Sequence, residues 1–278
     1  HAWYGAQKGR LGAETSQKRA DSLWSAIQGE DRIAKLAGNP MLLTTIACIH
    51  QRDTILPDQR VKLYHEAVEI LLQRWQMAAF GEAWGEKHAR LKQALQGKDA
   101  MLRRLMEHLA YEAHKRGDGA NESGDLPRYE AMAIIAAREY LGTDTLASDF
   151  LDYVDQRAGL LVGRGGEPNR PAVYSFPHRT FQEYLTGCYL LGEGRAREVL
   201  ELLEKHATEA EKWTLPVELG AEEILYNGTR SGKSILLDIA NLLIPEQPGY
   251  DRLALWGGIT AALAGVDTVQ KDKVTGTA

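Results

Sequence analysis

The run from Tyr174 to Leu185 changes its hydrophobic period in the middle, and this change constrains the fold more than any other stretch. Before Pro177 the run is rich in β-branched and aromatic residues, which is typical of a short strand. After Pro177 the apolar residues recur at steps of three and four, which predicts a helix whose first turn Pro177 suits. His178 is therefore expected at a strand-to-helix junction, near free N–H groups of the kind that bind an anion such as a phosphate.

The patterns that surround this run predict a mostly α-helical fold with one small β-hairpin. Helical patterns over 87–116, 126–141 and 146–157 precede two short strands over 160–162 and 172–176. Three helices followed by a hairpin with a glycine-rich tip is the layout of a winged helix. The other predicted helices cover 16–27, 41–50, 58–77, 196–205, 211–226, 234–243 and 253–264.

This order of elements predicts four parts of the chain. Residues 1–80 form a helical domain, and residues 81–194 form the winged-helix domain. Residues 195–266 form an α-helical, repeat-like array without a clean fixed period. Residues 267–278 are polar, and we expect them to be a disordered tail.

Two motifs carry a resemblance to a known family. The run Phe176-Pro-His-Arg-Thr-Phe-Gln-Glu-Tyr-Leu185 resembles the end of the winged-helix domain of NACHT NTPases, the STAND-class switch ATPases that include NOD-like receptors and bacterial defence proteins. Leu36-Ala-Gly-Asn-Pro-Met-Leu-Leu43, followed by Leu56-Pro-Asp-Gln-Arg-Val-Lys-Leu-Tyr64, is similar to the helical domain beside the nucleotide-binding core of that family. The family's phosphate loop and Mg²⁺-binding acidic strand have no counterpart here. Because the sequence also begins at His1 rather than Met, we expect the C-terminal half of a switch whose nucleotide-binding core lies upstream.

The resemblance implies a role for two residues in binding ADP or ATP. The histidine that matches His178 contacts the β-phosphate of ADP, and the proline that matches Pro40 packs on the adenine, while Mg²⁺ belongs to the upstream core. From the residues alone, a capping or partly buried histidine that orders the junction is the favoured interpretation of His178, and the resemblance reverses that preference. Pro40 could be only the start of a helix.

The resemblance also implies a function. ADP bound between the core and the winged helix holds a closed state, and exchange for ATP swings the winged helix away so that the parent protein can oligomerise. In a bacterial member this would serve antiviral defence, with a trigger protein bound through the C-terminal repeats. We predict no catalytic residues in this chain and no ATP hydrolysis by the chain alone, although the parent protein would be an ATP-binding NTPase. A plainer reading is a helical scaffold whose nucleotide contacts have decayed.

The main alternative is a winged-helix regulator that binds nucleic acid. Against it, the chain carries a formal net charge of −5 with a pI near 6.0, which gives no basic surplus for a phosphate backbone. The third helix carries Asp149, Asp152 and Asp155, which DNA phosphates would repel. Arg164 and Arg170, on the predicted wing, are compatible with DNA but are too few to favour it. We therefore expect no DNA partner.

A second phosphate-binding motif is a near miss. The run Gly228-Thr-Arg-Ser-Gly-Lys-Ser234 has three residues between its glycines, whereas a phosphate loop needs four. It also follows a helical pattern over 219–226 rather than a strand, so a turn between helices is expected.

The remaining composition points to an ordinary soluble protein. Cys48 and Cys188 lie in apolar helical patterns and are expected to be buried thiols, and no Cys/His spacing indicates a metal site. The longest apolar run, over 235–244, is too short to span a bilayer. With no signal peptide and no membrane partner expected, the predicted location is the cytoplasm.

Overall fold

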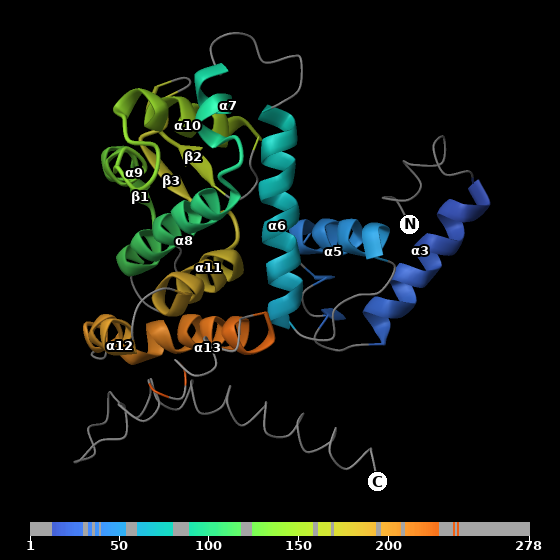
Figure 1. The fold of residues 1–278 in the computed structure, drawn as a ribbon. Helices are drawn as coiled ribbons and strands as arrows, with labels where there is room; N and C mark the ends of the chain where they lie inside the picture. Colours follow the sequence, from blue (N-terminus) through green and yellow to red (C-terminus); the bar gives the residue numbers. More distant parts are fainter. Residues whose placement is uncertain are drawn as a thin grey trace. The chain divides into compact units, whose positions relative to one another are not determined.

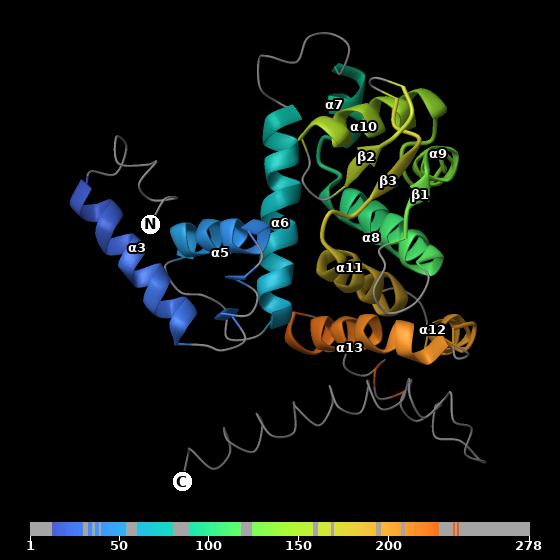
Figure 2. The ribbon, with the colours of Figure 1, turned by 180° about the vertical axis from the view of Figure 1, so that it is seen from behind.

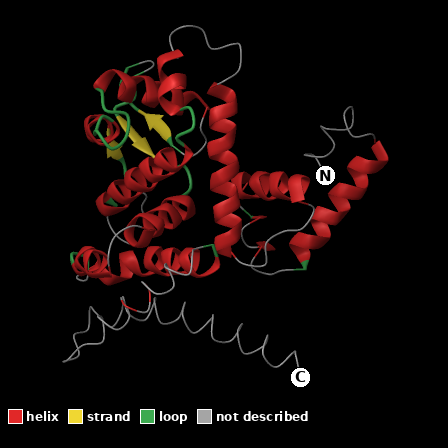
Figure 3. Ribbon diagram, in the orientation of Figure 1, coloured by secondary structure: helices red, strands yellow, loops and turns green. Residues whose placement is uncertain are grey.

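The computed structural model describes the parts of the chain over 13–29, 33–34, 37–38, 40–53, 60–79, 89–117, 124–157, 161–167, 170–192, 196–206, 209–227, 236 and 238. In these parts the chain forms α-helices and one small antiparallel sheet (Figure 3). The predicted mostly α-helical fold is therefore confirmed. Contacts divide the chain into two compact units, residues 1–71 and 72–278, and each is described by itself.

The first unit contains helices α3 (Ala13–Gln28) and α5 (Pro40–Asp53) and the first part of α6 (Arg60–Ala79). These helices agree with the patterns predicted over 16–27, 41–50 and 58–77. They share one hydrophobic core, made by Ala20, Leu23, Ile27, Ile33, Ile46, Ala47, Ile49 and Leu63. The predicted helix start at Pro40 is also confirmed.

The second unit contains the remaining elements (Figure 1). In chain order these are α7 (Ala89–Leu95), α8 (Asp99–Arg116), β1 (Leu126–Pro127), α9 (Arg128–Ile135), α10 (Asp144–Arg157), β2 (Val162–Arg164), β3 (Val173–Ser175), α11 (Arg179–Gly192), α12 (Ala196–Glu204) and α13 (Ala210–Tyr226).

The sheet has the strand order β1-β3-β2, with both pairs antiparallel. Tyr174 in the central strand lies opposite Leu126 on one side and Gly163 on the other. Taken from α8 to β3, the order helix, strand, helix, helix, strand, strand is that of a winged helix, as predicted. The predicted hairpin is present as β2 and β3.

The third strand, β1, corrects the sequence analysis. Leu126 and Pro127 were expected to open a helix, but they pair with β3, and the helix begins only at Arg128. A strand of two residues is too short to display an alternating period, so its pairing is decided by β3 rather than by its own sequence. The helix also ends at Ile135, not at 141, and the chain then turns with Gly142 at φ +75°.

Two further boundaries differ from the prediction. The helical pattern over 87–116 is two helices, α7 and α8, because the chain turns over 96–97 and Gly97 adopts φ +70°, a conformation that glycine reaches without steric penalty. Strand β2 begins at Val162 instead of ending there.

Helix α8 forms as its pattern predicted. Its four apolar positions, Leu102, Leu105, Leu109 and Ala113, are all buried, because a three-and-four spacing places them on one face of the helix. Helix α7, by contrast, buries only Leu91 and Leu95.

Helix α11 is the central helix of the second unit. It packs against α8 on one side and against α13 on the other, as the two opposite views agree (Figures 1 and 2). Residues 181–188 are buried without interruption, which a helix can achieve only when neighbours cover all its faces.

Helices α12 and α13 confirm the helical patterns over 196–205 and 211–226. The predicted domain limits at 80, 194 and 266 stay predictions, although α13 packs directly on α11 across the limit at 194. Most of the helices predicted over 234–243 and 253–264, and the tail over 267–278, lie outside the described residues.

Cys48 and Cys188 are buried thiols that form no disulfide, as predicted. Among the helices of the described residues, none combines the length and the apolar character needed to cross a membrane.

Candidate functional site

The predicted site residue His178 lies between β3 and α11. Phe176 is buried and Pro177 is exposed, and the helix begins at Arg179. The carbonyl oxygen of His178 accepts hydrogen bonds from the backbone N–H groups of Phe181 (3.1 Å) and Gln182 (3.4 Å). His178 therefore occupies the position that caps the start of α11.

This geometry corrects one expectation. Pro177 was predicted in the first turn of the helix, but it lies two residues before Arg179, and His178 stands between it and the helix. The junction itself, a strand followed within a few residues by a helix, is as predicted. The first N–H groups of such a helix have no intrahelical acceptor and face the residues that precede it.

The His178 side chain is partly buried. This burial lowers the pKa of His178 below the ordinary histidine value, so the imidazole is neutral at pH 7. A neutral imidazole keeps one N–H, which can donate a hydrogen bond to an anionic oxygen. The start of a helix is in general a favourable place for an anion, because its first N–H groups point toward it.

Arg179, the next residue, forms an ion pair within α11. Its Nε donates to Oε1 of Glu183 at 2.6 Å, one turn further along α11. Its Nη1 is buried and has no hydrogen-bond partner among the described residues.

A polar network holds α11 between its two neighbours. Arg103 of α8 donates through Nη2 to the Tyr184 hydroxyl of α11 (2.8 Å) and through Nε to Oε1 of Glu107 (3.1 Å). The Tyr184 hydroxyl donates in turn to Oε2 of Glu223 on α13 (2.9 Å). Burial raises the pKa of Tyr184, so this hydroxyl keeps its proton. The network fixes the helix whose start carries His178.

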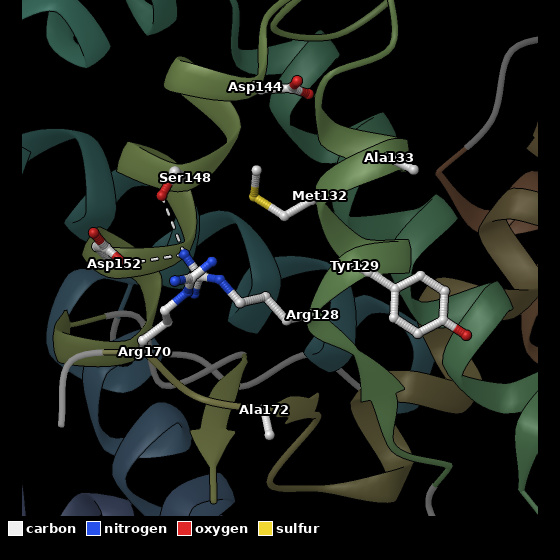
Figure 4. A pocket seen from close by; sticks show the side chains of 9 residues that line it. All are labelled: Arg128, Tyr129, Met132, Ala133, Asp144, Ser148, Asp152, Arg170 and Ala172. Atoms are coloured by element: carbon white, nitrogen blue, oxygen red, sulfur yellow. Dashed lines mark hydrogen bonds and ion pairs between the residues drawn. The ribbon is translucent and has the colours of Figure 1, made fainter. Parts of the chain in front are cut away.

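A second candidate site is a pocket of about 800 Å³ beside the two helices of the helix-turn-helix (Figure 4). Helix α9 contributes Tyr129, which is 70% exposed, and helix α10 contributes Asp144 at its start. The other residues that line the pocket are Arg128, Met132, Ala133, Ser148, Asp152, Arg170 and Ala172.

Arg128 is held within this pocket. Its Nη1 donates to the Tyr174 hydroxyl (2.7 Å), and its Nη2 lies 3.1 Å from Oγ of Ser148 and 3.5 Å from Oδ1 of Asp152. A guanidinium with these partners joins α9, α10 and the sheet, and is not available to an incoming phosphate. This pocket therefore contains a structural arginine.

The acidic residues of α10 fall on two faces. Asp152 lies in the pocket with Arg128, but Asp149 is buried, with its Oδ2 3.6 Å from Nη2 of Arg90. Asp149 therefore does not face solvent, which corrects the expectation that it would repel DNA. Asp144, which was not among the three predicted aspartates, lines the pocket and is exposed to solvent. Arg164 of the wing is paired with Asp125 at 2.5 Å.

Pro40, the other predicted site residue, lies in a different unit from His178. Pro40 begins α5 in the first unit, whereas His178 belongs to the second unit. The contact of Pro40 with adenine stays a prediction. The glycine run over 228–234 lies outside the described residues, and the segment before it is helix α13, as predicted.

Sequence reasoning missed Arg103, Arg128 and Glu223, which organise the two polar networks. One signal was available, because Arg103 and Glu107 are four residues apart on one helix and such pairs meet on the helix surface. Among the described residues, no group of three or more His, Cys, Asp or Glu side chains could hold a metal ion.

Comparison with known families gives one match. Residues 60–190 match the family described as the winged helix-turn-helix domain C-terminal to NACHT. The matched segment runs from the start of α6 almost to the end of α11, so it includes His178. No curated protein and no solved structure matches the chain significantly.

Proposed function

Because residues 60–190 belong to the winged helix-turn-helix domains that lie C-terminal to NACHT, we propose that this chain is the regulatory, nucleotide-sensing portion of a NACHT-type ATPase switch. In this proposal the chain works in the cytoplasm as part of a defence or signalling protein. An upstream core supplies the phosphate loop and Mg²⁺. The winged helix contributes a contact to ADP that exists only in the closed state.

The observation that carries the proposal is the position of His178. It caps the start of α11, its neutral imidazole retains an N–H donor, and the family match includes it. These features fit one phosphate oxygen of a nucleotide. ADP bound there would supply the negative charge, and the chain would supply the donors.

The hydrogen bonds of α11 to its two neighbours suggest how one contact between His178 and ADP could hold the whole winged-helix domain in the closed state. The Tyr184 hydroxyl is hydrogen-bonded to both α8 and α13. A displacement of the start of α11 would therefore move these two helices with it. Loss of the contact with ADP would then free the winged helix as a unit and permit oligomerisation. A contact of Pro40 with adenine, which the resemblance implies, is a separate proposal for the first unit.

The alternative of nucleic-acid binding has less support. The fold has the right topology, but the pocket beside α9 and α10 contains Asp144 and Asp152, and Arg128 is already bonded to the protein. Two carboxylates, Asp144 and Asp152, and two arginines, Arg128 and Arg170, line this pocket, so this face has no surplus of the cations that a DNA-binding winged helix presents to phosphates.

The test is His178→Ala in the intact protein that contains the upstream core. A hydrogen bond to a charged phosphate oxygen contributes roughly 1.5–3 kcal/mol, so its loss should shift the balance from the closed to the open state roughly ten- to a hundred-fold. We expect less ADP retained through purification and more oligomer without a trigger. His178→Asn, which keeps a neutral donor, should restore part of the retention.

Phe181→Ala is the control for folding. Phe181 is buried next to the junction, and its truncation should destabilise the winged helix by roughly 3–5 kcal/mol. His178→Ala should leave the melting temperature nearly unchanged. Unchanged ADP retention and unchanged basal oligomerisation in His178→Ala would reduce His178 to a local cap and refute the proposal.

A further inference from the structure

Six aromatic rings form a continuous row through the second unit, which we call the aromatic row. Neighbouring ring centroids lie 3.7–5.6 Å apart. In spatial order the rings belong to His108, Tyr189, Tyr111, His206, Trp213 and His114. The row connects α8 and α11 with the end of α12 and the start of α13.

Two histidines in the row join the segment of α12 and α13 to α8. His206 stacks on Trp213 with ring centroids 3.7 Å apart, and its Nε2 is hydrogen-bonded to the Tyr111 hydroxyl at 2.9 Å. His114 lies edge-on to Trp213 and donates from Nε2 to the backbone oxygen of Lys212 at 3.0 Å. Both histidines are buried, with 7% and 4% of their surface exposed.

The bond from His114 fills a gap that a proline creates. Pro216 lies inside α13 and has no N–H, so it cannot donate to the carbonyl four residues earlier. That carbonyl belongs to Lys212, and it is the one that accepts from His114. The first turns of α13 are thus held to α8 at the point where the helix itself lacks a hydrogen bond.

The charges around these two rings are mostly positive. His114 faces Lys212 of α13, Arg179 of α11 and His206 in the turn after α12. His206 faces Tyr111 and Lys115 of α8, Lys205 beside it, and Glu209 and Lys212 at the start of α13. Glu209 is the carboxylate that favours a proton on His206.

Burial and these cations oppose protonation of the two rings. Burial lowers the pKa of His114 to about 4, with the charges of Lys212 and Arg179 acting in the same direction and the hydrogen bond to the Lys212 carbonyl in the opposite one. Burial likewise lowers the pKa of His206 to about 4, although Glu209 acts in the opposite direction. A ring released to water would titrate near 6.5. The docked state is therefore favoured above pH 6.5 and loses stability as pH falls from 6.5 towards 4.

We propose that the aromatic row is an acid-sensitive latch. Protonation of His114 and His206 releases α12 and the part of α13 before Pro216 from α8, with the hinge at Pro216. The rest of α13 stays in place, because Gly220 and Glu223 hold it to α11. A protein that senses acidification could in this way uncouple the helices after the winged helix from the winged helix itself.

Amide hydrogen exchange of the full chain between pH 7.5 and 4.5 tests the latch. Each measured rate is divided by the intrinsic exchange rate of an unprotected amide at that pH. Each pH unit below the pKa of a released histidine raises the opening constant up to tenfold. Between pH 6.5 and 4.5 we therefore expect a rise of up to about a hundred-fold per histidine for amides over 196–215. Amides of α8, α10 and α11 should keep their protection at the same pH.

The variant His114→Gln with His206→Phe removes both titrating groups and retains an amide donor and a stacked ring. It should flatten the pH dependence over 196–215, whereas His65→Gln on α6 should leave it unchanged. An NMR titration of the imidazole Cε1–H signals of the unaltered chain gives the same answer without a substitution. The latch is refuted if either histidine titrates near 6.5 in the docked state. It is also refuted if the double variant keeps the pH dependence, or if all helices lose protection together.

Discussion

Gly187 of α11 and Gly220 of α13 face each other where the two helices cross, and their backbones are in direct contact. A Cβ atom on Gly187 would lie 2.7 Å from the backbone nitrogen of Gly220 and 2.1 Å from the backbone oxygen of Pro216. A Cβ on Gly220 would lie 2.3 Å from the backbone oxygen of Gly187. Two helices can approach this closely only where neither carries a side chain.

The first prediction concerns this crossing. Gly187→Ala places a Cβ against backbone atoms that cannot rotate away, so α13 must move from α11. We expect the free energy of unfolding to fall by roughly 1–3 kcal/mol, measured by urea denaturation. Gly192→Ala is the matched control on the same helix, because its Cβ would meet only the end of the Arg104 side chain at 3.8 Å. If both variants had equal stability, the crossing would not be as tight as described.

The second prediction concerns the network that joins α8, α11 and α13. Glu223→Ala removes the acceptor of the Tyr184 hydroxyl and one carboxylate beside Arg103. We expect a loss of roughly 1–3 kcal/mol in the free energy of unfolding, because buried polar groups lose their partner. Tyr184→Phe should cost clearly less in the Glu223→Ala background than alone. Additive effects in this double-mutant cycle would contradict a direct bond between the two residues.

The third prediction concerns nucleic acid. With Asp144 and Asp152 in the pocket beside α9 and α10, the chain should bind duplex DNA no more tightly than about 1 μM at physiological salt, which is the strong end of non-specific binding. Fluorescence anisotropy with a labelled duplex measures this. Tighter binding with a steep salt dependence that Arg170→Glu abolishes would instead support a nucleic-acid-binding regulator.

The fourth prediction concerns catalysis. The chain alone should not hydrolyse ATP, because its glycine run over 228–234 is one residue too short for a phosphate loop and nothing in the sequence supplies the Mg²⁺ carboxylates of the family. Single-turnover assays with radiolabelled ATP measure this. Hydrolysis that Lys233→Ala abolishes would show that the short run binds phosphate after all.

Local pattern was sufficient for most of the fold. The helical pattern over 87–116 predicted the helix that forms as α8, and the change of period at Pro177 predicted the junction where His178 lies at the start of α11. It was insufficient for β1, because two residues carry no period and their pairing depends on β3. The resemblance of the motif over 176–185 to NACHT proteins agrees with the family match over 60–190, whereas the motif over 36–43 lies outside the matched residues.

The sequence by itself thus determined most of the helices, the hairpin and the strand-to-helix junction, since each depends on neighbours within a few residues, and the motif over 176–185 indicated the family of the winged helix. Only the tertiary structure decided which polar groups meet. Arg103 and Tyr184 are 81 residues apart in the chain, and His114 and Lys212 are 98 apart. Such contacts leave no periodic trace in the sequence, because the packing of α8, α11 and α13 alone brings their side chains together.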